Sequence, residues 1–319
     1  MKLLFVMDGL DRVHPEKDTT FGFVQSAALL GHECEHCLIH QVERIGGTVT
    51  AWARSLRYEA APAGTEGPGR IWLEGAPRRL DLARDVDAVF IRKDPPFDSP
   101  YHHATLILEH LRGQTLVVND PRGLREANEK LYALHFADWM PKTIVTSERQ
   151  AILDFVREVG GRAVIKPLDG AGGYGVLGLK AGDGNEKAII DLLTKEGREL
   201  AEVQEFLPDV KDGDKRVLLL DGEPLGAILR VPPEGDHRAN IHIGGSVVPT
   251  ELDEQELRLV AAVGPRLRQD GLYFVGLDLI GGKLTEVNVT SPTGIRELST
   301  HRGERISDRV IRWTESKVG

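Results

Sequence analysis

Short apolar runs alternate with helix-periodic segments along the first 120 residues. The runs KLLFVMD, VDAVFIRKD and TLVVND have the length and composition of buried strands. Between them, FGFVQSAALLG has helical periodicity, with Thr19 and Thr20 as caps and Gly31 as its stop, and PYHHATLILEHL is a helix that a proline opens. This alternation predicts a mostly parallel sheet covered by helices.

Polar residues directly follow two of these strands. Asp8 follows the first strand, and the group Arg92, Lys93 and Asp94 ends another. Because ligands of parallel sheets collect beyond the carboxyl ends of the strands, we expect these side chains to face a ligand. The Gly- and Pro-rich stretch from about residue 46 to residue 80 has no firm period and predicts small edge strands and loops.

The pattern from Pro121 onward is mixed and predicts an α+β arrangement in the C-terminal part of an otherwise α/β chain. PRGLREANEKLYALHFADWM predicts one long helix capped by Asp120. The segments that follow predict a strand, a helix, a strand–glycine loop–strand unit, a further strand, a hairpin and a helix: KTIVT, SERQAILDFVREVGG, AVIKPLDGAGGYGVLGL, ELAEVQEFLP, KRVLLLDGEPLGAILRV and DEQELRLVAAVGPRLRQDG. Between the hairpin and the last helix, PPEGDHRANIHIGGS has no periodicity, and its length indicates a functional loop.

The last hairpin, LDLIGGKLTEVNVTSP, carries polar residues that strands disfavour. Asp278, Glu286 and Asn288 interrupt its apolar pattern. One interpretation is a hydrated outer face of an edge strand. The other is a cation site, because Glu286 and Asn288 point to the same side of a strand and hard cations such as Mg²⁺ take oxygen ligands.

A shared site in this hairpin requires a particular turn geometry. With a plain two-residue turn at Gly281 and Gly282, Asp278 would pair with Thr285 and point away from Glu286. We therefore predict an odd number of residues in the connection or a β-bulge. A three-residue turn would place Asp278 diagonal to Glu286.

A glycine-rich loop follows Lys166 at the end of an apolar strand. The loop, DGAGGYG from Asp169 to Gly175, holds four glycines in seven residues and leads into a strand rather than a helix. Backbone amides in such a loop can point at phosphate oxygens. The alternative is a flexible turn beside a surface lysine, but the density of glycines and the apolar strand favour a flap over phosphates.

Two arginines lie on the strands of the preceding hairpin. Arg216 opens one strand and Arg230 lies near the end of its partner. Together they can converge on a phosphate or an acyl phosphate, although either alone would be read as a solvated edge residue.

Composition narrows the class of protein. The 319 residues are 41% apolar and 28% charged, with a formal charge of −9 and no block of Lys and Arg. This balance argues against nucleic acid or an anionic membrane as the main partner. No run approaches the roughly 20 apolar residues of a membrane span, and the first apolar run is too short for a secretory signal. We expect a cytoplasmic protein.

The only cysteines, Cys34 and Cys37, form a CxxC with three neighbouring histidines. This motif suggests zinc or redox chemistry, but GHECEHCLIH alternates like a strand and would turn the two sulfurs to opposite faces. We expect two buried thiols and no metal here.

Five segments together resemble the bacterial glutathione synthetases of the ATP-grasp superfamily. They are RKDPPFD, NEKL, KPLDGAGGYG, KDGDKRVLLLDGEP and FVGLDLIGGKLTEVNVTSPTGIRE, and they occur in the order of that family. The resemblance implies an ATP-grasp fold with an N-terminal Rossmann-like parallel-sheet domain. It also implies a carboxylate–amine ligase that joins γ-glutamylcysteine and glycine through an acyl phosphate, releasing ADP and phosphate.

By match with these segments, the resemblance assigns roles to individual residues. Arg216 and Arg230 would neutralise the acyl phosphate. Residues of the ATP site would be Lys130, Lys166, Asp169, Gly170, Gly172, Gly173, Tyr174, Gly175, Gln204, Glu205, Phe206, Leu207 and Asp214. Residues facing the other substrates would be Asp8, Arg92, Lys93, Arg238, Asn240, Ser291 and Thr293. Two Mg²⁺ ions, with Mn²⁺ as an alternative, would be held by Asp278, Glu286 and Asn288.

The resemblance also implies an organisation of the chain. It predicts an N-terminal substrate domain over residues 1–120, a lid subdomain over 121–203 and a C-terminal subdomain with the metal site over 204–319. It further implies a homo-oligomer, a tetramer or a dimer.

One segment departs from the family pattern. Where the family reads Ala-Ala-Gly-Gly-Arg, this chain has IHIGGS from Ile241 to Ser246, without the positive charge. A ligase for a different amino acid or thiol peptide therefore stays open. A nucleotide-binding regulator without turnover is disfavoured, because it would need no acyl-phosphate machinery. A dinucleotide oxidoreductase is disfavoured because MDGLDR lacks the required glycines.

Overall fold

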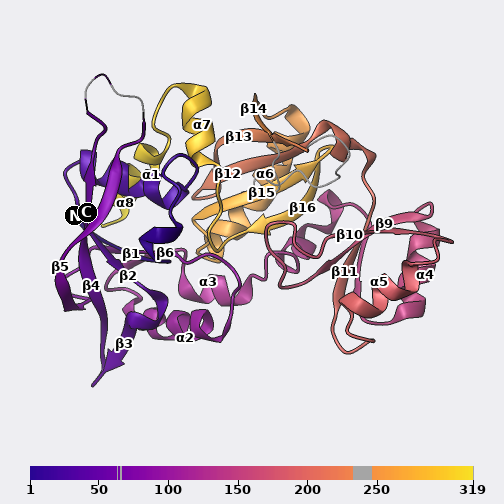
Figure 1. The fold of residues 1–319 in the computed structure, drawn as a ribbon, viewed down its shortest axis with the longest axis horizontal. Coiled ribbons are helices and arrows are strands. Elements are labelled where there is room, and N and C mark those ends of the chain that lie inside the picture. Colours follow the sequence, from indigo (N-terminus) through magenta and orange to yellow (C-terminus); the bar gives the residue numbers. More distant parts are fainter. Residues whose placement is uncertain (63, 65–66, 233–245, 319) are drawn as a thin grey trace.

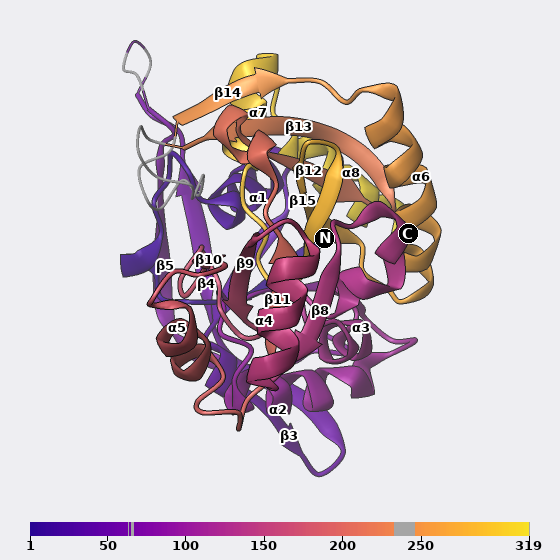
Figure 2. The same cartoon turned by 90° about the vertical axis from the view of Figure 1, so that its right-hand side faces the viewer.

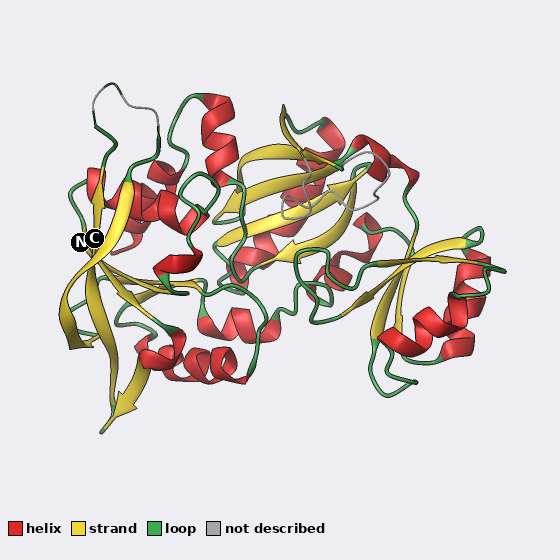
Figure 3. Ribbon diagram, in the orientation of Figure 1, coloured by secondary structure: helices red, strands yellow, loops and turns green. Residues whose placement is uncertain are grey.

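The computed structural model describes residues 1–62, 64, 67–232 and 246–318. In this part of the chain three sheets follow one another along the long axis of the molecule (Figure 1). Helices lie against each sheet (Figure 3). No helix among the described residues is long and apolar enough to cross a membrane.

The N-terminal sheet has seven strands in the order β3-β4-β2-β1-β6-β7, with β5 paired to β4. The pairs β1–β2, β1–β6 and β6–β7 are parallel, as the alternation of strands and helices predicts. Its strands are β1 (Lys2–Met7), β2 (Glu33–Cys37), β3 (Val42–Ile45), β4 (Thr48–Glu59), β5 (Arg70–Asp81), β6 (Ala88–Arg92) and β7 (Leu116–Val118).

The prediction of small edge strands and loops between residues 46 and 80 was wrong. β4 and β5 have 12 residues each and form a long antiparallel pair. The strand β5 is exposed along most of its length, so its sequence lacks the apolar alternation that identifies a half-buried strand.

Two helices of this domain begin at aspartates. The helix α1 (Thr19–Leu29) is capped by Asp18, whose carboxylate accepts from the Phe21 amide at 2.8 Å, rather than by the predicted Thr19 or Thr20. Gly31 ends it with φ of +83°. The helix α2 (Ser99–Leu108) is capped by Asp98.

The prediction of one long helix from residue 121 was wrong. The helix α3 (Pro121–Glu126) ends early, and a kinked 3₁₀ segment, η4, covers Tyr132–Trp139. Between them the side-chain oxygen of Asn128 accepts the backbone N–H groups of Lys130 and Leu131. This local competition with the helical hydrogen bonds breaks the helix and leaves Glu129 and Lys130 in an irregular segment.

The small sheet has the order β10-β9-β11-β8 and is antiparallel throughout. Its elements are β8 (Thr143–Thr146), α4 (Arg149–Glu158), β9 (Arg162–Pro167), β10 (Leu177–Lys180), α5 (Glu186–Leu193) and β11 (Ala201–Glu205). A separate hydrophobic core, which includes Ile152, Ile165 and Val203, lies between this sheet and its two helices. This part of the chain therefore has a hydrophobic core of its own.

The C-terminal sheet has the order β14-β13-β12-β15-β16, also antiparallel. Its elements are β12 (Asp214–Leu220), β13 (Glu223–Val231), β14 (Ser246–Thr250), α6 (Glu254–Gln269), β15 (Phe274–Ile280), β16 (Lys283–Asn288), α7 (Ile295–Arg302) and α8 (Ser307–Val318). The remaining 3₁₀ segments are η1 (Leu10–Arg12), η2 (Ile39–Gln41), η3 (Glu109–Leu111) and η5 (Pro208–Asp212). The predicted hairpin turns at Asp221 and Gly222, both with positive φ.

The N-terminal and C-terminal sheets share their hydrophobic cores. One cluster joins Leu3 and Phe5 to Phe274 and Ile311, and the helix α8 packs beside α1 (Figures 1 and 2). The Ser26 and Ser307 hydroxyls are hydrogen-bonded across this contact at 2.8 Å. The last helix of the chain therefore completes the N-terminal domain, which fixes the position of the two larger sheets.

Both cysteines are buried and free. Cys34 contributes to the cluster that contains Phe5, whereas Cys37 contributes to the cluster on the other side of the sheet. The opposite orientation expected from strand alternation is therefore confirmed.

Candidate functional site

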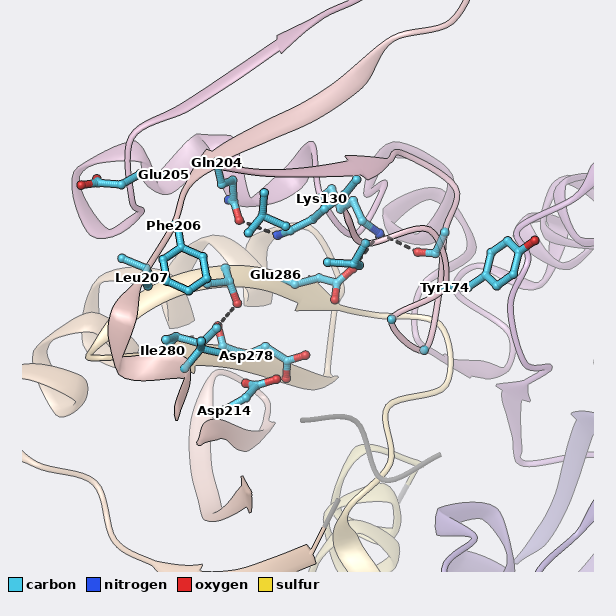
Figure 4. Close-up of a pocket in the computed structure, with 18 residues that line it drawn as sticks. Lys130, Tyr174, Gln204, Glu205, Phe206, Leu207, Asp214, Asp278, Ile280 and Glu286 are labelled. Atoms are coloured by element: carbon cyan, nitrogen blue, oxygen red, sulfur yellow. Dashed lines mark hydrogen bonds and ion pairs between the residues drawn. The ribbon is translucent and has the colours of Figure 1, made fainter. Parts of the chain in front are cut away.

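Two clefts meet at the hairpin of β15 and β16. The first lies between the small sheet and the C-terminal sheet (Figure 4). The second runs from the C-terminal sheet toward the start of α1. Asp278, Glu286, Gly172 and Gly173 line both clefts.

The hairpin contains the predicted bulge. Gly281 and Gly282 form a two-residue turn, with Ile280 paired to Lys283, so the predicted alternative of a three-residue turn was wrong. The register shifts between Asp278 and Leu279, and Asp278 therefore pairs with Glu286 instead of Thr285. The extra residue, Thr285, donates from its hydroxyl to the Asp278 carbonyl at 3.1 Å. Directly paired residues share a face, so the bulge brings the two carboxylates together.

A buried charge cluster surrounds Asp278. Asp278 Oδ2 accepts from Arg216 Nη2 at 3.0 Å and lies 3.0 Å from Arg230 Nη2, and Arg230 also donates to Asp214. Burial alone would raise the pKa of Asp278, but the guanidinium groups of Arg216 and Arg230 outweigh it and hold that pKa below its ordinary value. Burial raises the pKa of Asp214 to about 6, against the opposing charge of Arg230. The two arginines thus converge on one point, as their positions on paired strands predict.

Lys130 links the irregular segment to the glycine loop and to the hairpin. Its Nζ donates to the Gly170 carbonyl at 2.6 Å and to Glu286 Oε1 at 2.9 Å (Figure 4). Burial lowers the pKa of Lys130, but the charge of Glu286 outweighs it and gives a net rise. Lys130 is therefore a cation at neutral pH and lies at the floor of the first cleft.

The wall of the first cleft comes from β9, β11 and the segment after β11. Lys166 donates to Gln204, and Phe206 is backed by the Arg162 guanidinium 3.9 Å from its ring centroid. The following residues of the predicted ATP site line this cleft: Lys130, Lys166, Gly170, Gly172, Gly173, Tyr174, Gln204, Glu205, Phe206, Leu207 and Asp214.

Two predicted members of the ATP site lie beside the cleft. Asp169 lines a smaller neighbouring pocket and contacts Asn128, whereas Gly175 has φ of +74° and packs against Pro167. Both shape the glycine loop without lining the main cleft. Tyr174 belongs to the lining of the cleft at the glycine loop, but its ring points outward and the residue is 83% exposed (Figure 4).

The second cleft contains most of the predicted substrate residues. Arg92 is buried, donates to Thr20 Oγ1 at 3.1 Å and to the Pro292 carbonyl at 3.0 Å, and lines the cleft with Ser291 and Thr293. Asp8 and Lys93 do not line it. Asp8 accepts from the Asp94 amide at 2.9 Å and therefore supports the loop after β6. Arg238 and Asn240 lie outside the described residues, as does most of the aperiodic loop.

Sequence patterns missed several residues of the two clefts. Glu129 Oε1 accepts from the amides of Val289 and Thr290 and from the Thr290 hydroxyl. These bonds position the strap, the segment of Val289 and Thr290 that follows β16. Burial, together with the nearby charge of Glu286, raises the pKa of Glu129. Glu129 was not identified because it lies within the segment predicted as one long helix. The adjacent Glu129 and Lys130 beside Asn128 were a sequence feature that could have indicated a site. Residues from His14 to Thr20 also line the second cleft, and nothing in their spacing identified them.

The oxygen ligands expected of a magnesium site are present in this hairpin. Asp278 and Glu286 supply carboxylates on one face, where Asp278 pairs with Arg216 and Glu286 pairs with Lys130. Asn288 donates its Nδ2 to the Gly276 carbonyl at 3.3 Å, which leaves its oxygen free to ligate. Asn288 lines the second cleft beside them. The donor set therefore fits a hard divalent cation.

Family models match nearly the whole chain. The N-terminal domain of prokaryotic glutathione synthetase matches residues 1–125, and the ATP-grasp domain of the same enzyme matches residues 129–303. The chain belongs to the prokaryotic glutathione synthetase family. This membership confirms the resemblance seen in the five sequence segments and the expected ATP-grasp fold.

Curated relatives are similar to this chain over nearly their full length. A glutathione synthetase of Synechocystis sp. is 43% identical over 99% of this chain and 100% of its own. A glutathione synthetase of Vibrio vulnificus is 41% identical over 100% and 98%. Solved structures show the same fold at low identity: D-cycloserine synthetase DcsG has a TM-score of 0.64 at 17% identity, covering 98% of this chain and 100% of its own.

Proposed function

We propose that this chain is the ATP-dependent ligase that joins γ-glutamylcysteine to glycine, with release of glutathione, ADP and phosphate. One observation carries the proposal beyond family membership: the two clefts meet at the paired carboxylates of Asp278 and Glu286, flanked by Arg216 and Arg230. A nucleotide in the first cleft and a peptide carboxylate in the second would meet at that point.

The first cleft suits ATP. Lys130 and Lys166 line the cleft together with residues of the glycine loop. The lysine side chains and the backbone amides of the loop can therefore both bind phosphate oxygens. The apolar side chains of Phe206, Leu207 and Ile280 line the same cleft and suit a base. We assign the ATP site to the residues predicted from sequence, with Asp169 and Gly175 in a supporting position.

Arg216 and Arg230 are assigned to the acyl phosphate. In a reaction of this kind catalysis is mainly positioning and neutralisation of charge, and buried guanidinium groups supply both. Both side chains are held by Asp278, which keeps them in the second cleft. The chain's own residues thereby hold cationic groups where the transferred phosphoryl group would arrive.

The family uses ATP and a divalent metal. We propose two Mg²⁺ ions at Asp278, Glu286 and Asn288, with Mn²⁺ as a substitute. Such an ion would supply positive charge that offsets the charge of the phosphate oxygens.

The second cleft is assigned to the peptide substrate. Arg92, Ser291 and Thr293 line it, and a carboxylate of γ-glutamylcysteine is the natural partner of the buried Arg92. We retain Asp8 and Lys93 as supports of this cleft, and we keep the assignment of Arg238 and Asn240, between β13 and β14 in the sequence, to the substrates.

Direct assay of product tests the activity. The purified chain is incubated with ATP, Mg²⁺, γ-glutamylcysteine and glycine, while phosphate release and glutathione mass are followed. We expect equimolar phosphate and glutathione, with neither formed when one substrate is omitted. Phosphate release without glutathione would contradict the proposed reaction.

A second candidate comes from the departure at residues 241–246, where the family arginine is replaced by Ser246. A ligase for a different amine or thiol peptide would reveal itself in the same assay across a panel of amino acids and γ-glutamyl peptides. If glycine is replaced by another amine with higher kcat/KM, the acceptor assignment changes while the chemistry stays.

The division of the chain, its oligomeric state and its location complete the proposal. We propose the three-part division at residues 121 and 204, a homotetramer or homodimer, and a cytoplasmic location. Two free, buried cysteines agree with a reducing compartment. Size-exclusion chromatography with light scattering measures the oligomer, and a monomer at micromolar concentration would contradict it.

A further inference from the structure

A buried carboxylate lies next to the first cleft without lining it. Glu202, on β11, has no exposed surface, and its Oε2 lies 3.2 Å from Lys166 Nζ. Its Oε1 accepts from Gln204 Nε2 at 3.3 Å. Neither periodicity nor the family resemblance singles out Glu202, although an acid with no exposed surface is unusual.

The neighbours of Gln204 determine which way its amide points. Lys166 is an obligate donor, so the atom of Gln204 that it contacts must be the oxygen. Ionised Glu202 is an obligate acceptor, so the atom of Gln204 facing it must be the NH₂ group. Thr143 Oγ1 accepts the same NH₂ group at 3.2 Å. The amide orientation thus follows from chemistry rather than from the assignment of atoms.

This orientation presents an acceptor to the cleft. Gln204 lines the first cleft just before Phe206 and Leu207 (Figure 4). Its NH₂ group is hydrogen-bonded to Thr143 and Glu202, which do not line the cleft. Its oxygen has a second lone pair beyond the one taken by Lys166. Adenine carries an amino donor at position 6, whereas guanine carries a carbonyl acceptor there. An acceptor in the wall favours adenine and opposes guanine.

We propose that Glu202 is a positioning residue that selects the adenine nucleotide: it fixes the Gln204 amide with its oxygen toward the base and holds Lys166 beside it. The inference rests on the proposed use of ATP in this cleft. Burial raises the pKa of Glu202, while Lys166 opposes that rise and favours the ionised form. Without the carboxylate, the Gln204 amide can rotate and Lys166 loses its anionic partner.

Two substitutions test the role in graded fashion. Glu202→Gln keeps the volume and one acceptor but can also turn a donor toward Gln204, and Glu202→Met removes every hydrogen bond. We expect the ratio of kcat/KM for ATP over GTP to fall about tenfold in Glu202→Gln and further in Glu202→Met, the size of one lost hydrogen bond to a charged group. KM for ATP should rise by a similar factor, with kcat within about threefold of wild type.

The matched control is Glu35→Gln. Glu35 is also a buried carboxylate with a cationic partner, Arg78, but it lies on β2 in the N-terminal sheet. The substitution Glu35→Gln should lower the melting temperature without changing the ratio of kcat/KM for ATP over GTP. An unchanged ratio and KM in Glu202→Gln, or a fall in kcat alone, would overturn the proposal. If Glu202→Met does not fold, the nucleotide preference of Glu202→Gln alone tests the proposal.

Nucleotide binding separates this inference from the proposed reaction. The rise in melting temperature on adding ADP or GDP is measured without peptide or amine. We expect ADP to protect wild type more than GDP, and this difference to shrink in Glu202→Gln. That result would support the role of Glu202 even if the chain joins a different amine, whereas equal protection of wild type by ADP and GDP would refute it.

Discussion

Replacing Glu286 by glutamine removes one negative charge at the meeting point of the two clefts. Glu286 Oε1 lies 2.9 Å from Lys130 Nζ, and the bulge places the residue opposite Asp278. Glutamine has the same volume and keeps an oxygen that can accept from Lys130. We therefore expect the fold to persist and the chemistry to fail.

The magnitude follows from the two roles of the side chain. Loss of a carboxylate that would hold the charge-neutralising metal ion should lower kcat by about 10³-fold, or about 4 kcal/mol at about 1.4 kcal/mol per decade. The ion pair with Lys130 is only partly buried, with Glu286 24% exposed, so its loss should cost at most about 1.5–3 kcal/mol of stability. In a chain of this size that corresponds to a fall of several degrees in Tm.

The assay is phosphate release under saturating substrates, with a Mg²⁺ titration and a thermal melt on each variant. The matched control is Glu158→Gln, because Glu158 also pairs with a lysine, Lys142, at 3.3 Å but on the exposed surface. The control should keep wild-type kcat and Tm. Turnover of Glu286→Gln within tenfold of wild type would refute the assignment of this carboxylate.

Three further outcomes are expected. Arg230→Met leaves Asp214 and Asp278 buried without one of their shared cations, so chemical denaturation should show a loss of about 3–5 kcal/mol, and a loss below about 1 kcal/mol would contradict the cluster. Burial raises the pKa of Asp214 from 3.8 to about 6, so its contribution to stability is present below pH 3.8 and is lost as pH rises through 6. Asp214→Asn should remove that slope in denaturation curves between pH 4 and 7, and an unchanged slope would exclude this group as its source. Burial raises the pKa of Cys34 to about 12 and that of Cys37 further, so neither thiol should react with a thiol reagent at pH 8 until the protein is unfolded; labelling in the native state would contradict their burial.

The sequence was most informative where chemistry requires a local pattern. Alternation predicted the parallel core of the N-terminal sheet and the opposite orientation of Cys34 and Cys37. Glycine density predicted the loop after Lys166. Reasoning about strand faces predicted that the last hairpin needs a bulge, because a regular ladder would separate Asp278 from Glu286.

Failures occurred where backbone pairing or side-chain hydrogen bonds, rather than apolar periodicity, decided the local structure. The pair β4–β5 is held by backbone pairing with little burial of β5, so no apolar period marks it. The helix predicted after Pro121 breaks because Asn128 binds backbone groups, and the freed Glu129 is then held by the strap at Val289 and Thr290. Propensity within one segment carries no information about such partners.

The sequence by itself determined the class of this protein: the order of strands and helices, the glycine loop, and the set of arginines and oxygen-bearing side chains that we assign to phosphate and metal. These features depend on residue types and short spacings. Only the tertiary structure decided how they combine. It packed α8 against α1, brought Lys130 to Glu286 across 156 positions, and placed Glu202 behind Gln204 and Lys166. Those contacts join segments far apart in the chain, and their energies depend on burial and distance, which no local pattern encodes.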